Sequence, residues 1–210
     1  MDILALVADE RRQVADLVES LTAEQLATPS LCGEWTVKEV AGHLLAAVTT
    51  PVWRFLLLTA RSGFNVHRAS AELSRQVASR PTAELAAELR RHAGFRSRSI
   101  GPLAPLTDVQ VHAQDIRRPL GLPAALRPER LRPSLDFLVS GRAFGFTPRR
   151  RPAGLRFEAT DVGWAWGDGP LVRGAGEAVL LALAGRPVAL AELDGDGVAV
   201  LRDRLAGVSR

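Results

Sequence analysis

Residues 36–48, TVKEVAGHLLAAV, form the stretch that decides the fold. Thr36, with Glu39 three residues later, has the pattern of a capping box, which predicts the start of a helix. Apolar residues then recur at helical spacing, at Val37, Val40, Ala41, Leu44, Leu45 and Val48. Such a stripe buries one face of a helix, so this stretch predicts an amphipathic helix in a bundle. We expect the helix to continue past Pro51 with a kink and to end near Ser62.

Helical patterns on both sides of this stretch extend the bundle. The first 21 residues carry apolar positions at helical spacing, with charged residues between them. Further helices are expected at residues 67–79, 81–98, 105–118 and 128–143. The segments together predict an antiparallel helical bundle over residues 1–145.

The pattern changes after Gly145. Residues 146–154, FTPRRRPAG, are basic and contain proline, and we interpret them as a solvated linker, although three consecutive arginines could also grip phosphate. Short strands, turns with Gly and Asp, and two helices are then expected, at LRFEAT, VGWAWG, LVRG, 175–184, Val188 to Leu190 and 197–206. The fold class is therefore α+β, with a small α+β domain over residues 152–210.

Composition limits the possible functions. The single cysteine, Cys32, excludes a disulfide scaffold and a zinc finger built on cysteines, and it fits a reducing cytoplasm. The N-terminal residues lack the pattern of a secretory signal, and no apolar stretch is long enough to span a bilayer. The net charge is only +4, so the pI of about 10.7 comes from the very high pKa of arginine and not from a large excess of positive charge. We therefore expect a cytoplasmic protein that binds neither membranes nor nucleic acid.

Two of the four histidines lie where chemistry could occur. His43 sits beside the apolar stripe of its helix, which suits either a cavity-lining group or a boundary histidine without a ligand. His112 follows Asp108 by four residues, so the two side chains share one helix face and could grip a divalent ion. The same pair could also be an ordinary surface interaction. Asp115 either orients His112 or forms a structural salt bridge with Arg118.

Three segments resemble the mycothiol-dependent maleylpyruvate isomerase family. They are WTVKEVAGHL, TDVQVHAQDIRRPLG and ATDVGWAWGDGPLVRGAGEAVLLALAGRP, and they occur in this order along nearly the whole chain. The resemblance implies a DinB-like four-helix bundle followed by a small α+β domain. It also implies an actinobacterial setting, which the arginine-rich composition fits.

The resemblance implies a metal site and a catalytic arginine. The metal ligands of the family fall on His43, Asp108 and His112, and an arginine reaching toward the metal falls on Arg186. The isomerase pattern has Glu where this chain has Asp108, which is one methylene shorter but a competent ligand. The mixed imidazole and carboxylate set favours Zn²⁺.

The expected function is that of a metal-dependent enzyme with mycothiol as its thiol cosubstrate. It would transfer the sulfur to a small electrophile, or isomerise that electrophile from cis to trans. A non-catalytic module that binds metal or thiol for regulation is the alternative. The sequence leaves the electrophile and the oligomeric state open.

Overall fold

Residues 36–48 fold into helix α3 (Val37–Thr49) with the expected capping box. The Thr36 N–H donates to Glu39 Oε2 at 2.8 Å, and the Glu39 N–H donates to Thr36 Oγ1 at 3.3 Å. The expected continuation past Pro51 is wrong, because α3 ends at Thr49 and a separate helix, α4 (Val52–Arg61), begins after Pro51. Thr50 adopts extended backbone angles, as steric contact with a following proline ring favours.

The computed structural model describes residues 2–33, 35–97, 101–124 and 126–207. It divides into two units, Met1–Ala124 and Ala125–Arg210. The helices of the first unit besides α3 and α4 are α1 (Ile3–Ser20), α2 (Ala23–Ala27), α5 (Val66–Ala78), α6 (Thr82–Arg91) and α7 (Leu103–Arg117), with η1 (Arg118–Leu120) after α7.

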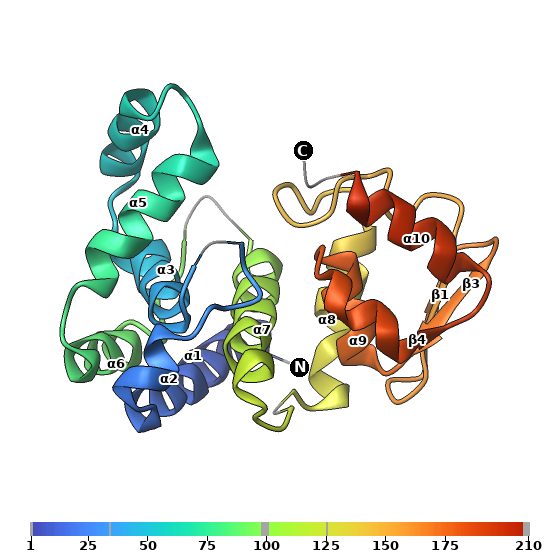
Figure 1. Ribbon diagram of the computed structural model, residues 1–210, viewed down its shortest axis with the longest axis horizontal. Coiled ribbons are helices and arrows are strands. Elements are labelled where there is room, and N and C mark those ends of the chain that lie inside the picture. Colours follow the sequence, from blue (N-terminus) through green and yellow to red (C-terminus); the bar gives the residue numbers. More distant parts are fainter. Residues whose placement is uncertain (1, 34, 98–100, 125, 208–210) are drawn as a thin grey trace. The chain divides into compact units, whose positions relative to one another are not determined.

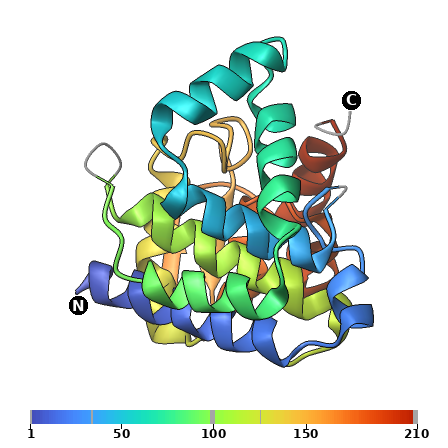
Figure 2. The ribbon, with the colours of Figure 1, turned by 90° about the vertical axis from the view of Figure 1, so that its left-hand side faces the viewer.

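Four helices of the first unit close a ring of contacts. Helix α1 packs against α6 and α7, and α3 packs against the same two helices from the other side (Figures 1 and 2). This is the expected four-helix bundle, and its core is the apolar stripe of α3 together with side chains from α1, α5, α6 and α7. Helix α6 is shorter than the expected 81–98, since it ends at Arg91; residue 98 lies outside the described residues.

Helix α5 lies very close to α3. A Cβ atom placed on Gly42 of α3 would lie 2.5 Å from the backbone oxygen of Ser74 and 2.9 Å from Cβ of Ala78. Only glycine permits this approach, because any side chain would have to displace the backbone of α5. The contact brings Ser70 of α5 within reach of His43 of α3.

The second unit is a four-stranded sheet with helices. Its elements are α8 (Pro128–Val139), β1 (Arg156–Ala159), β2 (Trp164–Trp166), β3 (Leu171–Gly174), α9 (Gly176–Leu183), η2 (Pro187–Glu192), β4 (Leu193–Asp194) and α10 (Gly197–Ala206). The strand order is β2-β1-β3-β4, with β1 parallel to β3 and the other pairs antiparallel. Every residue of α9 is buried, because α9 packs against both the sheet and α8. The α+β class is confirmed.

Helix α8 belongs to this second unit, whereas the sequence analysis counted it with the bundle. It packs against α9, and the Trp164 indole N–H of β2 donates to Asp136 Oδ1 of α8 at 2.7 Å. The structure thus divides at residues 124 and 125, upstream of the boundary expected at 145 to 152.

The basic segment after Gly145 is built into the second unit, so its interpretation as a solvated linker is wrong. Arg151 is buried, and its Nη1 donates to the carbonyl oxygens of Phe146 and Leu183. Leu183 is the last residue of α9, so this arginine caps a helix end. Residues 188–190, expected as a strand, lie within η2 instead. None of the described helices is long and apolar enough to cross a membrane.

Candidate metal centre and adjoining pocket

Two neighbouring helices of the bundle carry the three expected ligands. His43 lies on α3, and Asp108 and His112 lie four residues apart on α7. The side chains are mostly shielded, with 21%, 22% and 9% exposed. The packing of α3 against α7 therefore brings residues together that are far apart in the sequence.

The donor atoms of these side chains converge. Asp108 Oδ1 lies 3.7 Å from His43 Nε2 and 3.5 Å from His112 Nε2. One donor atom from each of the three residues lies within 4.8 Å of the other two. The two imidazole rings meet edge to face, with centroids 4.8 Å apart. The sequence analysis had correctly grouped these three residues in space.

The other nitrogen of each imidazole has its own partner. His112 Nδ1 lies 2.9 Å from Asp115 Oδ2, and His43 Nδ1 lies 3.4 Å from Ser70 Oγ. Asp115 is fully buried, and its contact with His112 Nδ1 fits the role of orienting His112. A hydrogen on each Nδ1 would leave both Nε2 lone pairs facing Asp108.

The electrostatics of the site follow from two buried carboxylates. Burial lowers the pKa of His112, but Asp108, Asp115 and a contact with Cys32 outweigh it and raise that pKa to about 10. Burial raises the pKa of Asp108, but the charges of His112 and Arg11 and the contact with His43 lower it to about 2. The carboxylates of Asp108 and Asp115 thus make this site strongly favour a positively charged group.

A buried arginine lies beneath the site. Arg11 of α1 is 7% exposed, and its Nη1 donates to the carbonyl oxygens of Ala93 and Phe95, both at 3.0 Å. Burial lowers its pKa and the nearby Asp108 raises it. Arg11 therefore supplies a fixed positive charge that partly balances the carboxylates.

The three converging residues fit a divalent ion. Bonds of about 2.0–2.2 Å at tetrahedral angles place the donors around Zn²⁺ roughly 3.3–3.6 Å apart. The observed separations of 3.5 and 3.7 Å between Asp108 Oδ1 and the two Nε2 atoms are close to that spacing. Two imidazoles and one carboxylate are also a donor set that zinc accepts, and three protein ligands leave a position open.

The sequence analysis did not place two further residues, Cys32 and Trp35, at this site. The Cys32 thiol joins His112 and Asp115 in a second group of donor atoms within 4.8 Å, which overlaps the first group at His112. The Trp35 indole lies against both histidines, with centroids 4.9 Å from His43 and 6.1 Å from His112. Both residues belong to the loop before α3, where no periodicity could indicate their direction.

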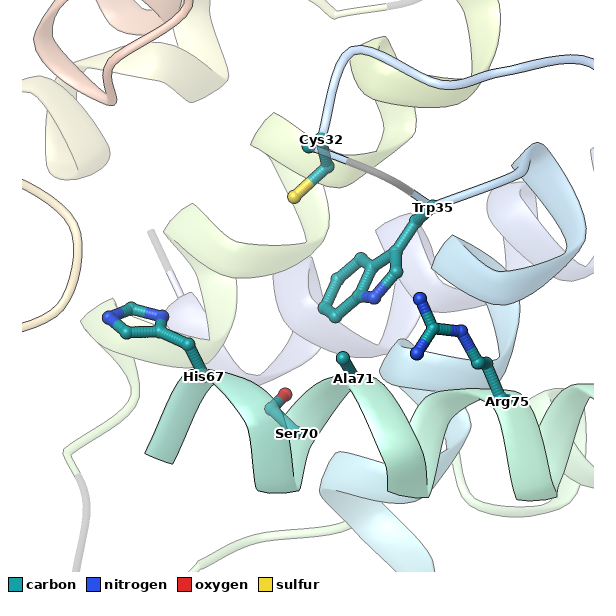
Figure 3. A pocket seen from close by; sticks show the side chains of 7 residues that line it. Cys32, Trp35, His67, Ser70, Ala71 and Arg75 are labelled. Atoms are coloured by element: carbon teal, nitrogen blue, oxygen red, sulfur yellow. The ribbon is translucent and has the colours of Figure 1, made fainter. Parts of the chain in front are cut away.

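A pocket of about 260 Å³ adjoins the histidines. Its lining residues are Cys32, Gly33, Trp35, His67, Ser70, Ala71 and Arg75. Figure 3 shows that α5 forms one wall and that Cys32 and Trp35 form another. Ser70 also contacts His43, so the pocket and the candidate metal site share a boundary. Arg75 brings positive charge to it and pairs with Glu39 Oε1 at 3.3 Å through Nε.

Arg186, the expected catalytic arginine, lies in the second unit. It is partly buried at the N-terminal end of η2, and its Nη1 donates to the carbonyl oxygen of Ala184 at 2.8 Å. Its charge also lowers the pKa of the neighbouring Arg151.

Comparison with known proteins agrees with the resemblance noted in the sequence. Residues 7–98 match the family model described as the mycothiol maleylpyruvate isomerase N-terminal domain. A solved structure described as the mycothiol-dependent maleylpyruvate isomerase is similar in fold, with a TM-score of 0.50 and 14% sequence identity. The similarity covers 88% of each chain. No curated protein matches the sequence.

Proposed function

Residues 7–98 of this chain match the family model of the mycothiol maleylpyruvate isomerase N-terminal domain, and from that similarity we propose a metal-dependent thiol enzyme. Its cosubstrate is mycothiol, and its other substrate is a small electrophile. The enzyme either transfers the sulfur to that electrophile or isomerises it from cis to trans. We place it in the cytoplasm, where a thiol cosubstrate stays reduced.

The observation that carries this proposal is the convergence of three donors. His43 Nε2, Asp108 Oδ1 and His112 Nε2 face one another, and Ser70, which contacts His43, also lines the adjoining pocket. A divalent ion there, with Zn²⁺ favoured, would lower the pKa of a coordinated thiol and so supply a nucleophile at neutral pH. The protein then needs no nucleophile of its own.

The residues around the donors hold them in the required form. Asp115 and Ser70 fix the ring orientations of His112 and His43. The Trp35 indole covers both rings and limits the access of water. With a divalent ion bound, the charges of the ion and of Arg11 would exceed those of Asp108 and Asp115, so the site would favour an anionic sulfur over a neutral one.

The chemistry on the electrophile needs no further group. The thiolate forms a carbon–sulfur bond to one carbon of an activated double bond, and the electron pair of the broken π bond moves onto the activating group, which leaves a single bond that can rotate. Breaking the same carbon–sulfur bond restores the double bond in the trans form and releases the thiolate. In a transfer reaction, the carbon–sulfur bond remains and a leaving group departs with its electron pair.

Two arginines are candidates for holding an anionic group. Arg75 lies in the pocket wall beside Trp35 (Figure 3). Arg186 is the candidate from the second unit, where its guanidinium would clamp a carboxylate of the thiol or of the substrate. Replacing Arg186 by Lys would then keep the fold and lower turnover, because Lys cannot form the bidentate contact.

The test combines metal analysis with turnover in the presence and absence of mycothiol. We expect one divalent ion per chain and turnover only with the thiol. His43→Ala and His112→Ala should lose both the ion and turnover, while His92→Ala serves as the matched control. His92 directly follows the last residue of α6, with its Nδ1 3.0 Å from the carbonyl oxygen of Glu88. If both histidine variants kept one ion per chain, His43 and His112 would not be metal ligands and the proposed site would be wrong.

The overlapping group with Cys32 gives a second control. If the ion lies between His43, Asp108 and His112, Cys32→Ser should retain it in full, because serine keeps the shape of the side chain. Loss of the ion in Cys32→Ser but not in His43→Ala would assign it to Cys32, His112 and Asp115 instead. Bound metal without thiol-dependent turnover of any electrophile would favour the regulatory module.

A further inference from the structure

Helix α4 presents an apolar surface to solvent. None of its residues is buried, and Trp53 is 67% exposed. We use the name α4 surface for the six exposed apolar side chains Val52, Trp53, Leu56, Leu57, Phe64 and Val66. In Figures 1 and 2, α4 lies at one end of the first unit, beside α5. No other part of the described chain exposes so many large apolar residues in succession.

The two sides of α4 are both apolar. Phe55 and Leu58 pack against the core of the bundle. At 100° per residue, Trp53, Leu56 and Leu57 lie on the opposite side of the helix. A helix that is apolar on both sides is ordinarily covered on both sides, so the exposed side calls for a partner.

The turn after α4 strengthens this conclusion. Phe64 has a φ of 61° and is 82% exposed. A bulky residue in the left-handed region costs about 1 kcal/mol or more, and burial against other residues of the first unit does not offset this cost. The strained backbone holds an aromatic ring out toward solvent in the turn that follows α4.

We propose that the α4 surface is a homodimer interface, in which α4 of one copy packs against α4 of a second copy. The six side chains expose roughly 700 Å² per copy, which approaches the ~800 Å² per partner of a stable interface. Trp53 and Phe64 supply the aromatic anchors that dominate such interfaces. A two-fold axis across α4 pairs the surface with itself, as most soluble homo-oligomers do.

The charges on α4 favour a second copy over an acidic partner. Arg54 and Arg61 lie at the edge of the α4 surface, about 100° from its centre, so pairing α4 with α4 buries neither guanidinium. The contact is apolar at its centre, and the charge of each copy is +4. Screening by salt therefore strengthens a dimer, whereas it weakens binding to an acidic protein or an anionic membrane.

The experiment measures the molar mass of the full chain by sedimentation over a range of concentrations, at low and high salt. The wild type should form a dimer that salt does not weaken. Leu56→Glu places a charge at the centre of the surface and should raise the dimer dissociation constant at least about tenfold. The matched control is Phe144→Glu, which adds the same charge at an exposed apolar residue of the second unit.

Three results would overturn the proposal. They are a monomeric wild type at the highest concentration, a dimer that survives in Leu56→Glu with native circular dichroism, and a dimer that Phe144→Glu disrupts equally. Cosedimentation of a monomeric wild type with phosphatidylglycerol vesicles, lost in Leu56→Glu, would assign the surface to a membrane instead. Thiol-dependent turnover tests the metal site separately, since α4 contributes none of its residues.

Discussion

Asp108 is the residue on which the candidate metal site depends most, because its Oδ1 faces both Nε2 atoms. Asp108→Asn keeps the shape of the side chain but removes the charge. The expected result is a loss of bound metal, measured by elemental analysis after dialysis. Asp108→Glu should retain metal, since the related pattern has Glu at this position and the ligand oxygens remain.

Retention of metal in Asp108→Asn, or loss of metal in Asp108→Glu, would contradict this role of Asp108. If Asp108→Asn kept its ion, the carboxylate would have only a structural role. If Asp108→Glu lost the ion, the site would require the length of the aspartate side chain in addition to its charge.

The raised pKa of His112 predicts how the stability of the ion-free protein depends on pH. Because this pKa is about 10 in the folded chain against an ordinary 6.5, protonation stabilises the fold fully below about pH 6.5. The stabilisation is lost as pH rises toward 10. Urea unfolding in the presence of a chelator should therefore give a falling free energy of unfolding over this window.

His112→Gln is the control for this pH effect, because it removes the titrating group from the same position. Its unfolding free energy should change less over the window than that of the wild type. Asp108 acts at the other end of the scale. Its pKa, lowered to about 2, stabilises the fold above about pH 3.8 and ceases to do so as pH falls through 2. A wild-type profile that is flat above neutral pH would contradict the role given to His112.

Sequence spacing could predict part of the site and not the rest. Asp108 and His112 share a helix face by arithmetic, and the capping box fixed where the helix with His43 begins. That Cys32, Trp35 and Ser70 also surround His43 and His112 depends on how a loop and a third helix pack. Such packing is set by long-range contacts, which leave no periodic pattern in the sequence.

At the scale of elements, the contact between α3 and α5 predicts a strong effect of a small substitution. Gly42→Ala places a Cβ 2.5 Å from the Ser74 carbonyl oxygen, so the helices must separate. We expect a loss of about 1–3 kcal/mol in the free energy of unfolding, measured with urea. Gly94→Ala is the control, since a Cβ there meets no atom within 4 Å. Equal effects of the two substitutions would mean that α5 moves freely.

In the second unit, we expect the stability of the fold to depend in a similar way on Arg151. Arg151→Met would remove the arginine donor from the carbonyl oxygens of Phe146 and Leu183, of which Leu183 keeps only the Thr147 hydroxyl, and should cost about 1–3 kcal/mol. Thermal unfolding measures this loss, and the exposed neighbour Arg150→Met should lie within about 0.5 kcal/mol of the wild type. A similar small effect at both positions would restore the interpretation of this segment as a solvated linker.

The ends of α9 and α3 are two places where the structure differs from the predicted secondary structure, and each difference has a physical reason. Basic residues next to proline indicate solvent exposure on average, but Arg151 is buried because the end of α9 offers it carbonyl acceptors. Pro51 was expected to bend a helix and instead separates two, since the preceding Thr50 takes an extended conformation. Local patterns located most helices correctly and could not decide either of these points.

At the scale of the whole molecule, the order of the two units was predictable and their boundary was not. The change from helical to alternating patterns after Gly145 indicated two kinds of architecture. Helix α8, however, is amphipathic like the bundle helices, and only the Asp136–Trp164 contact and its packing on α9 assign it to the second unit. The amphipathic pattern of a helix predicts that one face packs against another element, but it does not predict which element that is.

The positions of the three converging donors along the chain have a kinetic consequence. Asp108 and His112 form a local pair as soon as α7 is helical, whereas His43 joins them only after a long loop has closed. An ion held by all three donors would bind to the folded bundle and not to partly folded states in which His43 is still apart. Added Zn²⁺ should therefore slow unfolding while leaving the refolding rate nearly unchanged, as stopped-flow measurements can check. Faster refolding with Zn²⁺ would mean that α3 and α7 meet before the barrier.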